Sequence, residues 1–353
     1  MTGPLRIAQI APVATSVPPP LSGSIESLTA LLTDGLVDAG HAVTLFATGG
    51  SRTRATLHAT FARGYREDPA IWPWELCELI NVAAAVERAA AFDVIHYQAK
   101  YHPLALPFGR LSGVPLVVTL HHAPAASEVA LWARHYPDTP FVAVSKAQAR
   151  SMAGLNVVGL VPHAIDVTAF PHTPQAGDYL LFLGRFTEGK GVLQAIEVAR
   201  RAGLPLRLAA EANDYFRAHV APLVDGTDVV YVGEVTGAAK AALLGGARAL
   251  LYPVQADEPF GLVLAEATAC GTPVAALDRG AVREVIDDGV TGGVFDSLDG
   301  LVAGLPRVLS LDRARVRAVA ADRFGVERMV AGYAEVYQAL MGRRAPDARV
   351  AGR

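Results

Sequence analysis

The sequence predicts an α/β protein with two parallel-sheet domains. Short apolar runs alternate with segments of helical periodicity, and the alternation starts again at Tyr179. Between the two series lies the stretch 170–177, FPHTPQAG, whose prolines and glycine are typical of a linker. With 353 residues and a hydrophobic content of 52%, the chain is long enough for two domains with complete cores.

The first half predicts a βαβ series. Its predicted strands are the short apolar runs at 6–11, 42–46, 94–97, 116–120, 141–144 and 157–161. Its predicted helices, at 24–39 and 76–91, carry apolar residues at helical spacing. Because helices connect consecutive strands, we expect the strands to lie parallel in one sheet.

The second half repeats the pattern. Predicted strands are YLLFLG at 179–184 and VVYV at 229–232, and GVLQAIEVARRAG from Gly191 is a predicted amphipathic helix. A further helix is predicted at 326–340. We therefore divide the chain into an N-terminal domain at 1–172, a C-terminal domain at 173–325, a C-terminal helix at 326–341 that packs back toward the N-terminal domain, and a polar, disordered tail at 342–353.

The composition excludes several classes of function. A formal charge of −3 provides no basic field for nucleic acid, so no DNA or RNA partner is expected. Cys77 and Cys270 are too few for a disulfide framework or a cysteine metal cluster, which suits a reducing compartment. Since the chain has no D-x-D triplet and no His-x-x-x-His pair framed by a ligating acid, we expect no metal.

No secretory or membrane segment is predicted. The chain opens directly into the strand-like run at 6–11, without a secretory signal. The weakly charged stretch 7–30 is interrupted by Pro12 and by the three prolines at 18–20, which rule out a membrane helix. We therefore expect a cytoplasmic protein without a transmembrane segment.

The most informative motif is EPFGLVLAE, residues 258–266. Asp257 and Glu258 suit a helix cap, and Pro259 suits the first helical position. First-turn N–H groups have no acceptor inside the helix and lie at the positive end of its dipole. Such open groups are expected at Phe260, Gly261 and Leu262. The motif therefore predicts an anion site, for which phosphate is a natural ligand.

Glu266 lies two turns into this helix among small and apolar residues. An unpaired buried carboxylate costs at least about 1–3 kcal/mol, so Glu266 needs partners. One reading pairs it with a neighbouring arginine or a backbone amide. The other reading gives both of its oxygens to the two hydroxyls of a ribose.

Arg185 and Lys190 lie between a predicted strand and the start of the helix at Gly191. Cations at this end oppose the helix dipole unless an anion sits between them. Either residue alone suits a solvated loop equally well. Together with the helix near Glu258, the pair favours a diphosphate site.

Several motifs occur in an order that resembles retaining glycosyltransferases of family 4, which have the GT-B fold. They are EPFGLVLAE (258–266), GRFTEGKG (184–191), VPHAID (161–166), ACGTPV (269–274) and EVIDDGVTGG (284–293). The resemblance covers roughly residues 6–340. It implies two Rossmann-like domains with parallel sheets facing a central cleft, the N-terminal one binding the acceptor and the C-terminal one the nucleotide sugar.

The resemblance also implies roles for residues of the C-terminal domain. Glu258 contacts the donor sugar, and Glu266 binds the ribose. Arg185 and Lys190 hold the diphosphate. Backbone groups at the end of the strand 229–232 contact the base. The residues at that position are Gly233 and Val235.

In the N-terminal domain, the resemblance points to Gly23 and His121. Gly23 ends the long loop after the first strand and is expected to close over the diphosphate, although Ser24 replaces a second glycine of the family. His121 follows the strand 116–120 and is expected to face the donor sugar, whereas from the residues alone it is as readily a structural hydrogen-bonder. His122 and Glu211 are further departures from the family pattern.

The predicted function is retaining transfer of a sugar from a nucleoside diphosphate sugar, with a UDP-sugar favoured and a GDP-sugar as the alternative. The expected catalytic residues are Glu258, as an acceptor that orients the sugar, and His121. No cofactor or metal is expected, and the acceptor is a small molecule, a lipid-linked sugar or a glycan. A sugar-nucleotide epimerase or a non-catalytic binding protein of the same fold remains the alternative. A nucleotide-dependent oxidoreductase is disfavoured because the G-x-G-x-x-G turn is missing after both leading strands.

Overall fold

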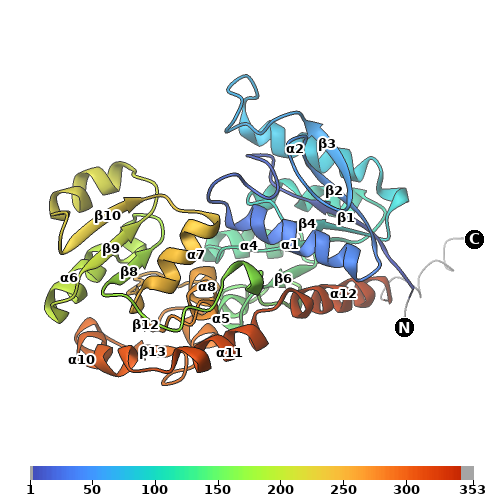
Figure 1. Ribbon diagram of the computed structural model, residues 1–353. Helices are drawn as coiled ribbons and strands as arrows, with labels where there is room; N and C mark the ends of the chain where they lie inside the picture. Colours follow the sequence, from blue (N-terminus) through green and yellow to red (C-terminus); the bar gives the residue numbers. More distant parts are fainter. Residues whose placement is uncertain (1–2, 343–353) are drawn as a thin grey trace, which may run out of the picture. The chain divides into compact units, whose positions relative to one another are not determined.

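The computed structural model describes residues 3–342, and the contacts divide them into two units (Figure 1). Unit 1 comprises residues 3–164 together with 326–342, and unit 2 comprises residues 165–325. The boundary predicted at residue 172 lies within unit 2. The predicted tail lies, from residue 343 onward, outside the described residues.

Unit 1 contains a parallel sheet that has seven strands within the described residues. They are β1 (Arg6–Ile10), β2 (Ala42–Thr48), β3 (Thr56–Phe61), β4 (Val94–Tyr97), β5 (Leu116–Thr119), β6 (Phe141–Ala143) and β7 (Val157–Leu160). Their order in the sheet is β3-β2-β1-β4-β5-β6-β7, and neighbouring strands are parallel. Ile7 of β1 is in register with Val43 and Val94. The predicted parallel arrangement is confirmed.

Helices flank this sheet. They are α1 (Ser24–Asp38), α2 (Trp74–Val86), α3 (Leu106–Leu111), α4 (Ala126–His135), α5 (Lys146–Ser151) and α12 (Val326–Gly342). The helix predicted at 76–91 is broken, because α2 ends at Val86 and a separate 3-10 turn follows at Ala89–Ala91. This break turns the chain so that Phe92 enters the core. No helix-breaking residue marks the position, which is why the sequence pattern ran through it.

Strand β3 is missing from the predicted elements. Its sequence, TLHATF, contains no buried position, because β3 lies at the edge of the sheet beside β2. An edge strand that buries little apolar surface lacks the continuous apolar run of a central parallel strand. The central strands of unit 1 have that run, and their buried side chains include Ile7, Ile10 and Phe141.

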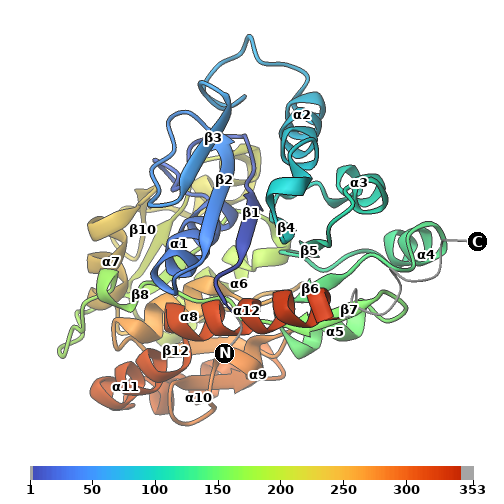
Figure 2. The same cartoon turned by 90° about the vertical axis from the view of Figure 1, so that its right-hand side faces the viewer.

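Helix α12 packs along α1, as Figures 1 and 2 both show (red and blue). A Cβ added at Gly35 of α1 would lie 2.5 Å from Val330 Cγ2 of α12. One added at Gly159 of β7 would lie 2.5 Å from Val336 Cγ2. Helix α12 therefore fits closely against α1 and β7.

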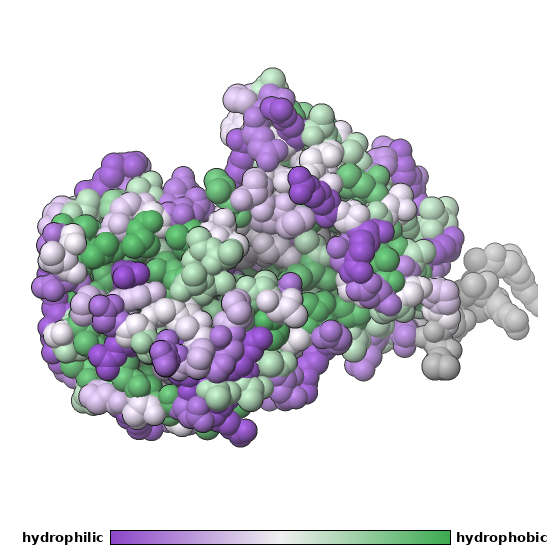
Figure 3. Space-filling view, viewed as in Figure 1, coloured by the Kyte–Doolittle hydropathy of each residue, from purple (hydrophilic) through white to green (hydrophobic). Residues whose placement is uncertain are grey.

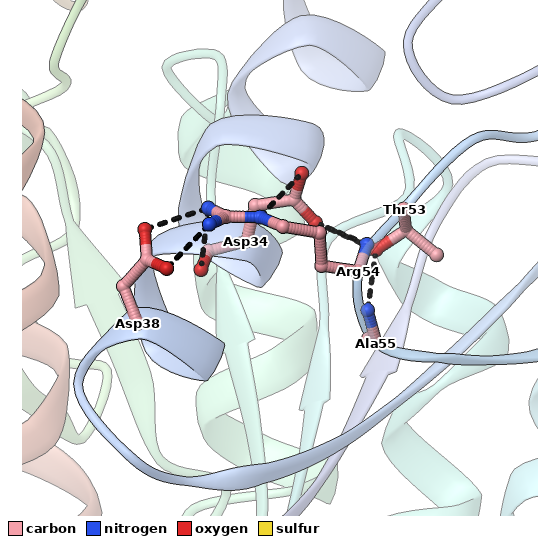
Figure 4. Close-up of polar contacts among 5 residues, drawn as sticks. All are labelled: Asp34, Asp38, Thr53, Arg54 and Ala55. Carbon is pink, nitrogen blue, oxygen red and sulfur yellow. Dashed lines mark hydrogen bonds and ion pairs between the residues drawn. The ribbon is translucent and has the colours of Figure 1, made fainter.

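An ionic cluster on the surface of unit 1 ties α1 to the loop before β3 (Figure 4). Arg54 forms ion pairs with Asp38 and Asp34, and its Nη2 donates to Asp38 Oδ2 at 2.6 Å. Asp34 Oδ1 also accepts from Thr53 Oγ1 at 2.7 Å and from the Arg54 backbone N–H at 2.9 Å. Polar side chains thus help to hold the edge of the sheet to α1.

Unit 2 contains a second parallel sheet, which has six strands within residues 165–325. They are β8 (Leu180–Leu183), β9 (Leu206–Ala209), β10 (Val229–Gly233), β11 (Ala249–Tyr252), β12 (Val274–Leu277) and β13 (Gly292–Phe295). Their order is β10-β9-β8-β11-β12-β13, with parallel neighbours. The strands predicted at 179–184 and 229–232 correspond to β8 and β10.

The helices of unit 2 connect these strands or follow the last of them. They are α6 (Val192–Ala202), α7 (Gly237–Gly246), α8 (Leu262–Ala269), α9 (Val282–Val285), α10 (Leu298–Leu309) and α11 (Arg313–Arg323). Helix α6 packs against α10 over a core that includes Phe182, Phe186 and Leu251. Helix α8 packs against α7 and α11. The helices thus form two packed groups. One consists of α6 and α10, and the other of α7, α8 and α11.

The surface carries both hydrophilic and apolar side chains (Figure 3). Large apolar side chains that are strongly exposed include Trp72, at 68%, and Leu111, at 74%. Among the helices of residues 3–342, none combines the length and the apolar character needed to cross a bilayer.

Candidate active site

The strand order of each sheet places two loops side by side at a topological switch point. In unit 2 this point lies between β8 and β11, and in unit 1 between β1 and β4. Open parallel sheets bind ligands beyond the carboxyl ends of the strands at such points. The loop after β8 carries Arg185 and Lys190, and the loop after β11 carries Glu258. In unit 1, the loop after β1 ends at Gly23, and Gln98 directly follows β4.

Helix α8 begins later than the sequence predicts. Its first residue is Leu262, and its cap residue Gly261 has a φ of +88°, in the left-handed region. The cap predicted at Asp257 and Glu258 is therefore wrong, because both residues lie in the loop before the helix. Phe260, also before the helix, is buried. The first-turn N–H groups that lack an intrahelical acceptor are thus those from Leu262 onward.

Gly261 and Gly280 shape the loop that carries Glu258. Gly280 has a φ of +59°, and a Cβ there would lie 2.3 Å from the carbonyl oxygen of Glu258. The next residue, Ala281, donates its backbone N–H to that same oxygen at 2.8 Å. Two glycines in left-handed conformations therefore hold the backbone of Glu258 in place. Gly280 follows β12, and the motif around Glu258 gave no sign of its role.

The structure brings Glu258 and Lys190 together. Lys190 Nζ lies 2.5 Å from Glu258 Oε2, and the two side chains are 27% and 11% exposed. Tyr252 Oη, at the end of β11, donates to the same oxygen. Burial, together with the carboxylate of Glu258, raises the pKa of Tyr252 well above its ordinary value, so the phenol keeps its proton. Glu258 Oε1 accepts no hydrogen bond from the described residues.

Lys190 reaches Glu258 because its turn packs against the loop after β11. The Gly189 carbonyl accepts from the backbone N–H of Gln255 at 2.9 Å. Gly191 has a φ of +76°, and a Cβ there would lie 2.0 Å from the carbonyl oxygen of Pro253. Only glycine allows this contact, which explains the last glycine of the motif GRFTEGKG. As predicted, Lys190 directly precedes a helix, since α6 begins at Val192.

Arg185 is placed differently from Lys190. Its side chain is exposed, directly after β8, and it makes no ion pair or hydrogen bond within residues 3–342. The predicted basic pair is therefore divided in this structure, with Lys190 held by a carboxylate and Arg185 open to solvent.

Glu266 has a protein partner. Lys240 Nζ of α7 lies 2.5 Å from Glu266 Oε1, and the side chains are 26% and 12% exposed. Lys240 also lies 5.8 Å from the ring centre of Phe170. The partner expected from the sequence was an arginine or a backbone amide, so the identity of the partner was missed. Oε2 of Glu266 accepts no hydrogen bond from the part of the chain that the structure describes.

One feature of the sequence indicates that Lys240 needs a partner. Helix α7, GAAKAALLGG, contains a single charged residue in an otherwise small and apolar segment. A lone lysine in such a helix needs a counter-charge or a route to solvent. Its pairing with α8 depends on which helices are neighbours, which the local sequence does not reveal.

Gly233 and Val235 lie at the carboxyl end of β10, at the same edge of the sheet as the loops of Lys190 and Glu258. Gly233 has a φ of +83°, and a Cβ there would meet no atom within 4 Å. The backbone at this position is therefore accessible to a ligand. That main-chain groups here contact a base stays a prediction.

Gly23 is the cap residue of α1 and has an extended φ of −177°. A Cβ there would lie 2.8 Å from Glu26 Oε2 and 2.9 Å from Pro19 Cγ. Space rather than conformation thus requires glycine here. Glu26 itself is 9% exposed, and burial raises its pKa.

His121 follows β5 and is held by two side chains of unit 1. Its Nε2 lies 2.9 Å from Gln98 Oε1, and its Nδ1 lies 3.5 Å from His163 Nε2. The His121 and His163 rings are stacked with centroids 5.2 Å apart. Burial, reinforced by the neighbouring His163, holds the pKa of His121 well below its ordinary value. His121 is therefore a neutral imidazole near neutral pH.

Comparison with known proteins identifies the family. The model for glycosyl transferases group 1 matches residues 169–323, and the model for Glycosyltransferase Family 4 matches residues 25–169. A phosphatidyl-myo-inositol mannosyltransferase of Mycolicibacterium smegmatis is 28% identical, over 90% of this chain and 88% of its own. A D-inositol 3-phosphate glycosyltransferase of Arthrobacter sp. is 27% identical, over 76% of this chain and 77% of its own.

Solved structures agree with the sequence matches. The crystal structure of AviGT4, a glycosyltransferase involved in avilamycin A biosynthesis, superposes with a TM-score of 0.73 at 26% identity. It covers 96% of this chain and 99% of AviGT4. The structure of HepE from Anabaena in complex with UDP-glucose has the same fold, with a TM-score of 0.71 at 16% identity over 95% of this chain and all of HepE. The chain belongs to the group 1, family 4 glycosyltransferases and is a sugar transferase of the GT-B fold.

Proposed function

We propose that this enzyme transfers a sugar from a nucleoside diphosphate sugar to an acceptor hydroxyl with retention of anomeric configuration and without a metal ion. One observation carries the proposal. At the switch point of unit 2, a carboxylate and a cation from two loops, Glu258 and Lys190, meet beside the start of α8. This combination suits a ligand with a sugar at one end and a diphosphate at the other.

The cations provide the neutralisation that a metal ion would otherwise supply. Lys190 is held 2.5 Å from Glu258, and Arg185 is exposed at the end of β8. The N–H groups at the start of α8 add a partial positive charge. We propose that these three groups stabilise the negative charge that develops on the departing diphosphate.

Glu258 is proposed to orient the donor sugar. Lys190 and Tyr252 both contact Oε2, which leaves Oε1 available for a sugar hydroxyl. A carboxylate engaged with a lysine and a phenol is a poor nucleophile, so a covalent intermediate on Glu258 is not proposed.

In the proposed reaction, the bond between sugar C1 and the diphosphate oxygen breaks while the acceptor oxygen bonds to C1 from the same face. The acceptor proton leaves with the diphosphate.

Glu266 is proposed to bind the ribose through Oε2, with Lys240 holding Oε1. The backbone at Gly233 and Val235 is proposed to contact the base. Gly23 and His121 of unit 1 are proposed to approach the diphosphate and the sugar.

The donor and acceptor classes are proposed from the base site and from the named relatives. We propose a UDP-sugar, with a GDP-sugar as the alternative, because main-chain contacts at the base distinguish the two poorly. For the acceptor we propose a small molecule, a lipid-linked sugar or a glycan. Two relatives are named for phosphatidyl-myo-inositol and D-inositol 3-phosphate, which makes inositol-containing compounds useful first acceptors to test.

The test is release of nucleoside diphosphate from a panel of UDP-, GDP- and ADP-sugars in the presence of a chelator, followed by mass spectrometry. We expect slow release from one donor by the wild type, and loss of release in Glu266→Ala and Arg185→Ala. Glu197→Ala and Arg201→Ala are matched controls, because these residues form a surface ion pair along α6. Tight donor binding without release, even with acceptors present, would overturn the proposal in favour of an epimerase or a binding protein.

A further inference from the structure

A network of buried polar side chains runs through unit 1 next to His121. Its members lie on β1, β4, β5 and α12 or directly after β4, and each is at most 2% exposed. They are Gln9, His96, Gln98, Thr119, Tyr333 and Tyr337. Buried polar groups are costly unless they are hydrogen-bonded, so the hydrogen bonds of such a network are expected to be mutually consistent.

The first arm of the network starts on α12. Tyr337 Oη lies 2.6 Å from His96 Nδ1 and accepts a hydrogen bond of 2.9 Å from Gln9 Nε2. Because a phenol has one proton, Tyr337 donates it to His96 Nδ1. His96 therefore carries its own proton on Nε2, which lies 2.7 Å from Thr119 Oγ1. Burial lowers the pKa of His96 to about 3, which keeps this ring neutral.

The second arm leads from Gln9 to Gln98. Gln9 uses its amide nitrogen on Tyr337, so its Oε1 faces Gln98 Nε2, at 3.4 Å. Gln98 Nε2 also lies 3.3 Å from His96 Nδ1, which is an acceptor in the first arm. Both contacts require the nitrogen of the Gln98 amide to point into the network. Its oxygen therefore points outward, to His121.

The Gln98 carbonyl oxygen lies 2.9 Å from His121 Nε2. A carbonyl oxygen only accepts hydrogen bonds, so His121 must carry its proton on Nε2. The lone pair of His121 then resides on Nδ1. The contact from Nδ1 to His163 is 3.5 Å long, at the outer limit of a hydrogen bond, and is easily exchanged for a ligand hydroxyl.

We propose that Gln98 is a positioning residue that holds His121 as the neutral Nε2–H tautomer, so that Nδ1 is presented as a hydrogen-bond acceptor to a hydroxyl of the donor sugar. Gln9 and Tyr337 hold the Gln98 amide in the required orientation. The catalytic consequence rests on the proposed function, whereas the tautomer of His121 does not.

The tautomer is measured directly on the full-length enzyme. Histidine ring correlations in ¹⁵N NMR spectra distinguish the Nε2–H tautomer, the Nδ1–H tautomer and the imidazolium, and a His121→Gln sample assigns the signals. At neutral pH we expect His121 as the Nε2–H tautomer. Observation of His121 as the Nδ1–H tautomer or as the imidazolium would overturn the proposal.

Two matched substitutions separate positioning from simple structural support. Gln98→Leu removes the contact with the His121 ring. Gln148→Leu removes hydrogen bonds of 2.7 and 3.1 Å from another buried amide to the carbonyls of Leu120 and His122, without touching the ring.

We expect Gln98→Leu to populate both neutral tautomers of His121 and to lower kcat by about 10- to 100-fold at nearly unchanged donor KM. Gln148→Leu should leave the tautomer unchanged. Gln98→Met, which keeps the length of the side chain, replaces Gln98→Leu if the latter fails to fold.

An unchanged tautomer in Gln98→Leu, or a loss of kcat no greater than that of Gln148→Leu, would overturn the proposal. Failure of the proposed function looks different. In that case the wild type turns over no donor, but the NMR spectra still report the tautomer of His121 independently of turnover.

Discussion

The two oxygens of Glu258 lie in different surroundings. Oε2 is shared between Lys190 and Tyr252, while Oε1 accepts no hydrogen bond from the described residues. A carboxylate held in this way keeps its direction when a hydroxyl approaches Oε1. Under the proposed function, we therefore expect Glu258 to determine the geometry of the donor sugar rather than the affinity for the nucleotide.

Substitution of Glu258 by glutamine tests this division. We expect Glu258→Gln to lower kcat by about 100-fold while the Kd for the nucleoside diphosphate changes by less than about threefold. Calorimetric binding and steady-state turnover measure the two quantities. Glu188→Gln, at an exposed carboxylate of the neighbouring turn, serves as the control. Equal losses in binding and turnover would contradict the orienting role.

The ion pair between Lys240 and Glu266 makes a prediction about stability. Removal of the lysine leaves a carboxylate that is 12% exposed without its cation. Because Lys240 is itself partly exposed, we expect Lys240→Met to lower the free energy of unfolding by only about 1–2 kcal/mol. A double-mutant cycle with Glu266→Gln, followed by urea denaturation, isolates the pair. If the double mutant loses the sum of both single effects, the two side chains do not interact.

At the scale of elements, the loop between β11 and α8 depends on Gly261. A Cβ at this residue would lie 2.9 Å from Leu264 Cδ1, in addition to the strain of a φ of +88°. We expect Gly261→Ala to destabilise unit 2 by at least about 1–2 kcal/mol and to reduce transfer.

Gly226→Ala is the matched control for this loop. Gly226 has a φ of +81° in the same unit, but a Cβ there would meet nothing within 4 Å. It should share the backbone strain and leave transfer unchanged. Thermal unfolding and turnover of the two variants separate the effect of backbone strain from that of the close contact with Leu264. Equal effects of the two substitutions on transfer would contradict a special role for the Gly261 loop.

Helix α12 contributes the hydroxyl from which the network of unit 1 starts. Tyr337→Phe removes both the donor to His96 and the acceptor of Gln9, and we expect a loss of about 1–3 kcal/mol in stability together with a lower kcat. Tyr333→Phe removes only a contact with Thr119 and should affect kcat less. Chemical denaturation and turnover provide the comparison. A larger loss of kcat in Tyr333→Phe than in Tyr337→Phe would contradict the connection from Tyr337 to His121 through Gln9 and Gln98.

The elements themselves were predicted unequally well. Strands β4 and β8 have dense apolar runs, which only a buried parallel strand explains, and their positions were confirmed to within a residue. Strand β3 was missed because an edge strand buries little. The start of α8 was placed too early, because the left-handed Gly261 and the packing of Gly280 against Glu258 arise from tertiary contacts.

At the scale of the whole molecule, the resemblance of five motifs gave the fold and the family, since their order reflects the complete two-domain chain. Most of the predicted site residues lie on those motifs, whereas Gly23, His121, Gly233 and Val235 were predicted from their positions after strands. Tyr252, Lys240 and Gln98 were not foreseen, because their roles depend on which strand ends and helices become neighbours. Sequence periodicity reports burial, but it does not report which buried groups meet.

The dependence of the free energy of unfolding on pH tests the buried position of Glu78 in unit 1. Burial raises the pKa of Glu78 from 4.5 to about 7, while its Oε1 accepts from the Val13 backbone N–H at 3.1 Å. Between these pH values the unfolded carboxyl has lost its proton and the folded one retains it, so stability falls as the pH rises. We expect the wild type to lose about 3 kcal/mol relative to Glu78→Gln between pH 4.5 and 7. Urea denaturation across this range measures the difference, and a constant difference would contradict the raised pKa.

Retaining transfer without a metal ion is tested by the anomeric form of the first sugar released. In ¹H NMR spectra recorded during slow hydrolysis of an α-linked nucleotide sugar with a chelator present, the anomeric signals identify the sugar as it is released. With retention, we expect the α-anomer to appear first and the β-anomer to follow only by mutarotation. Initial release of the β-anomer, or release only after a divalent cation is added, would contradict it.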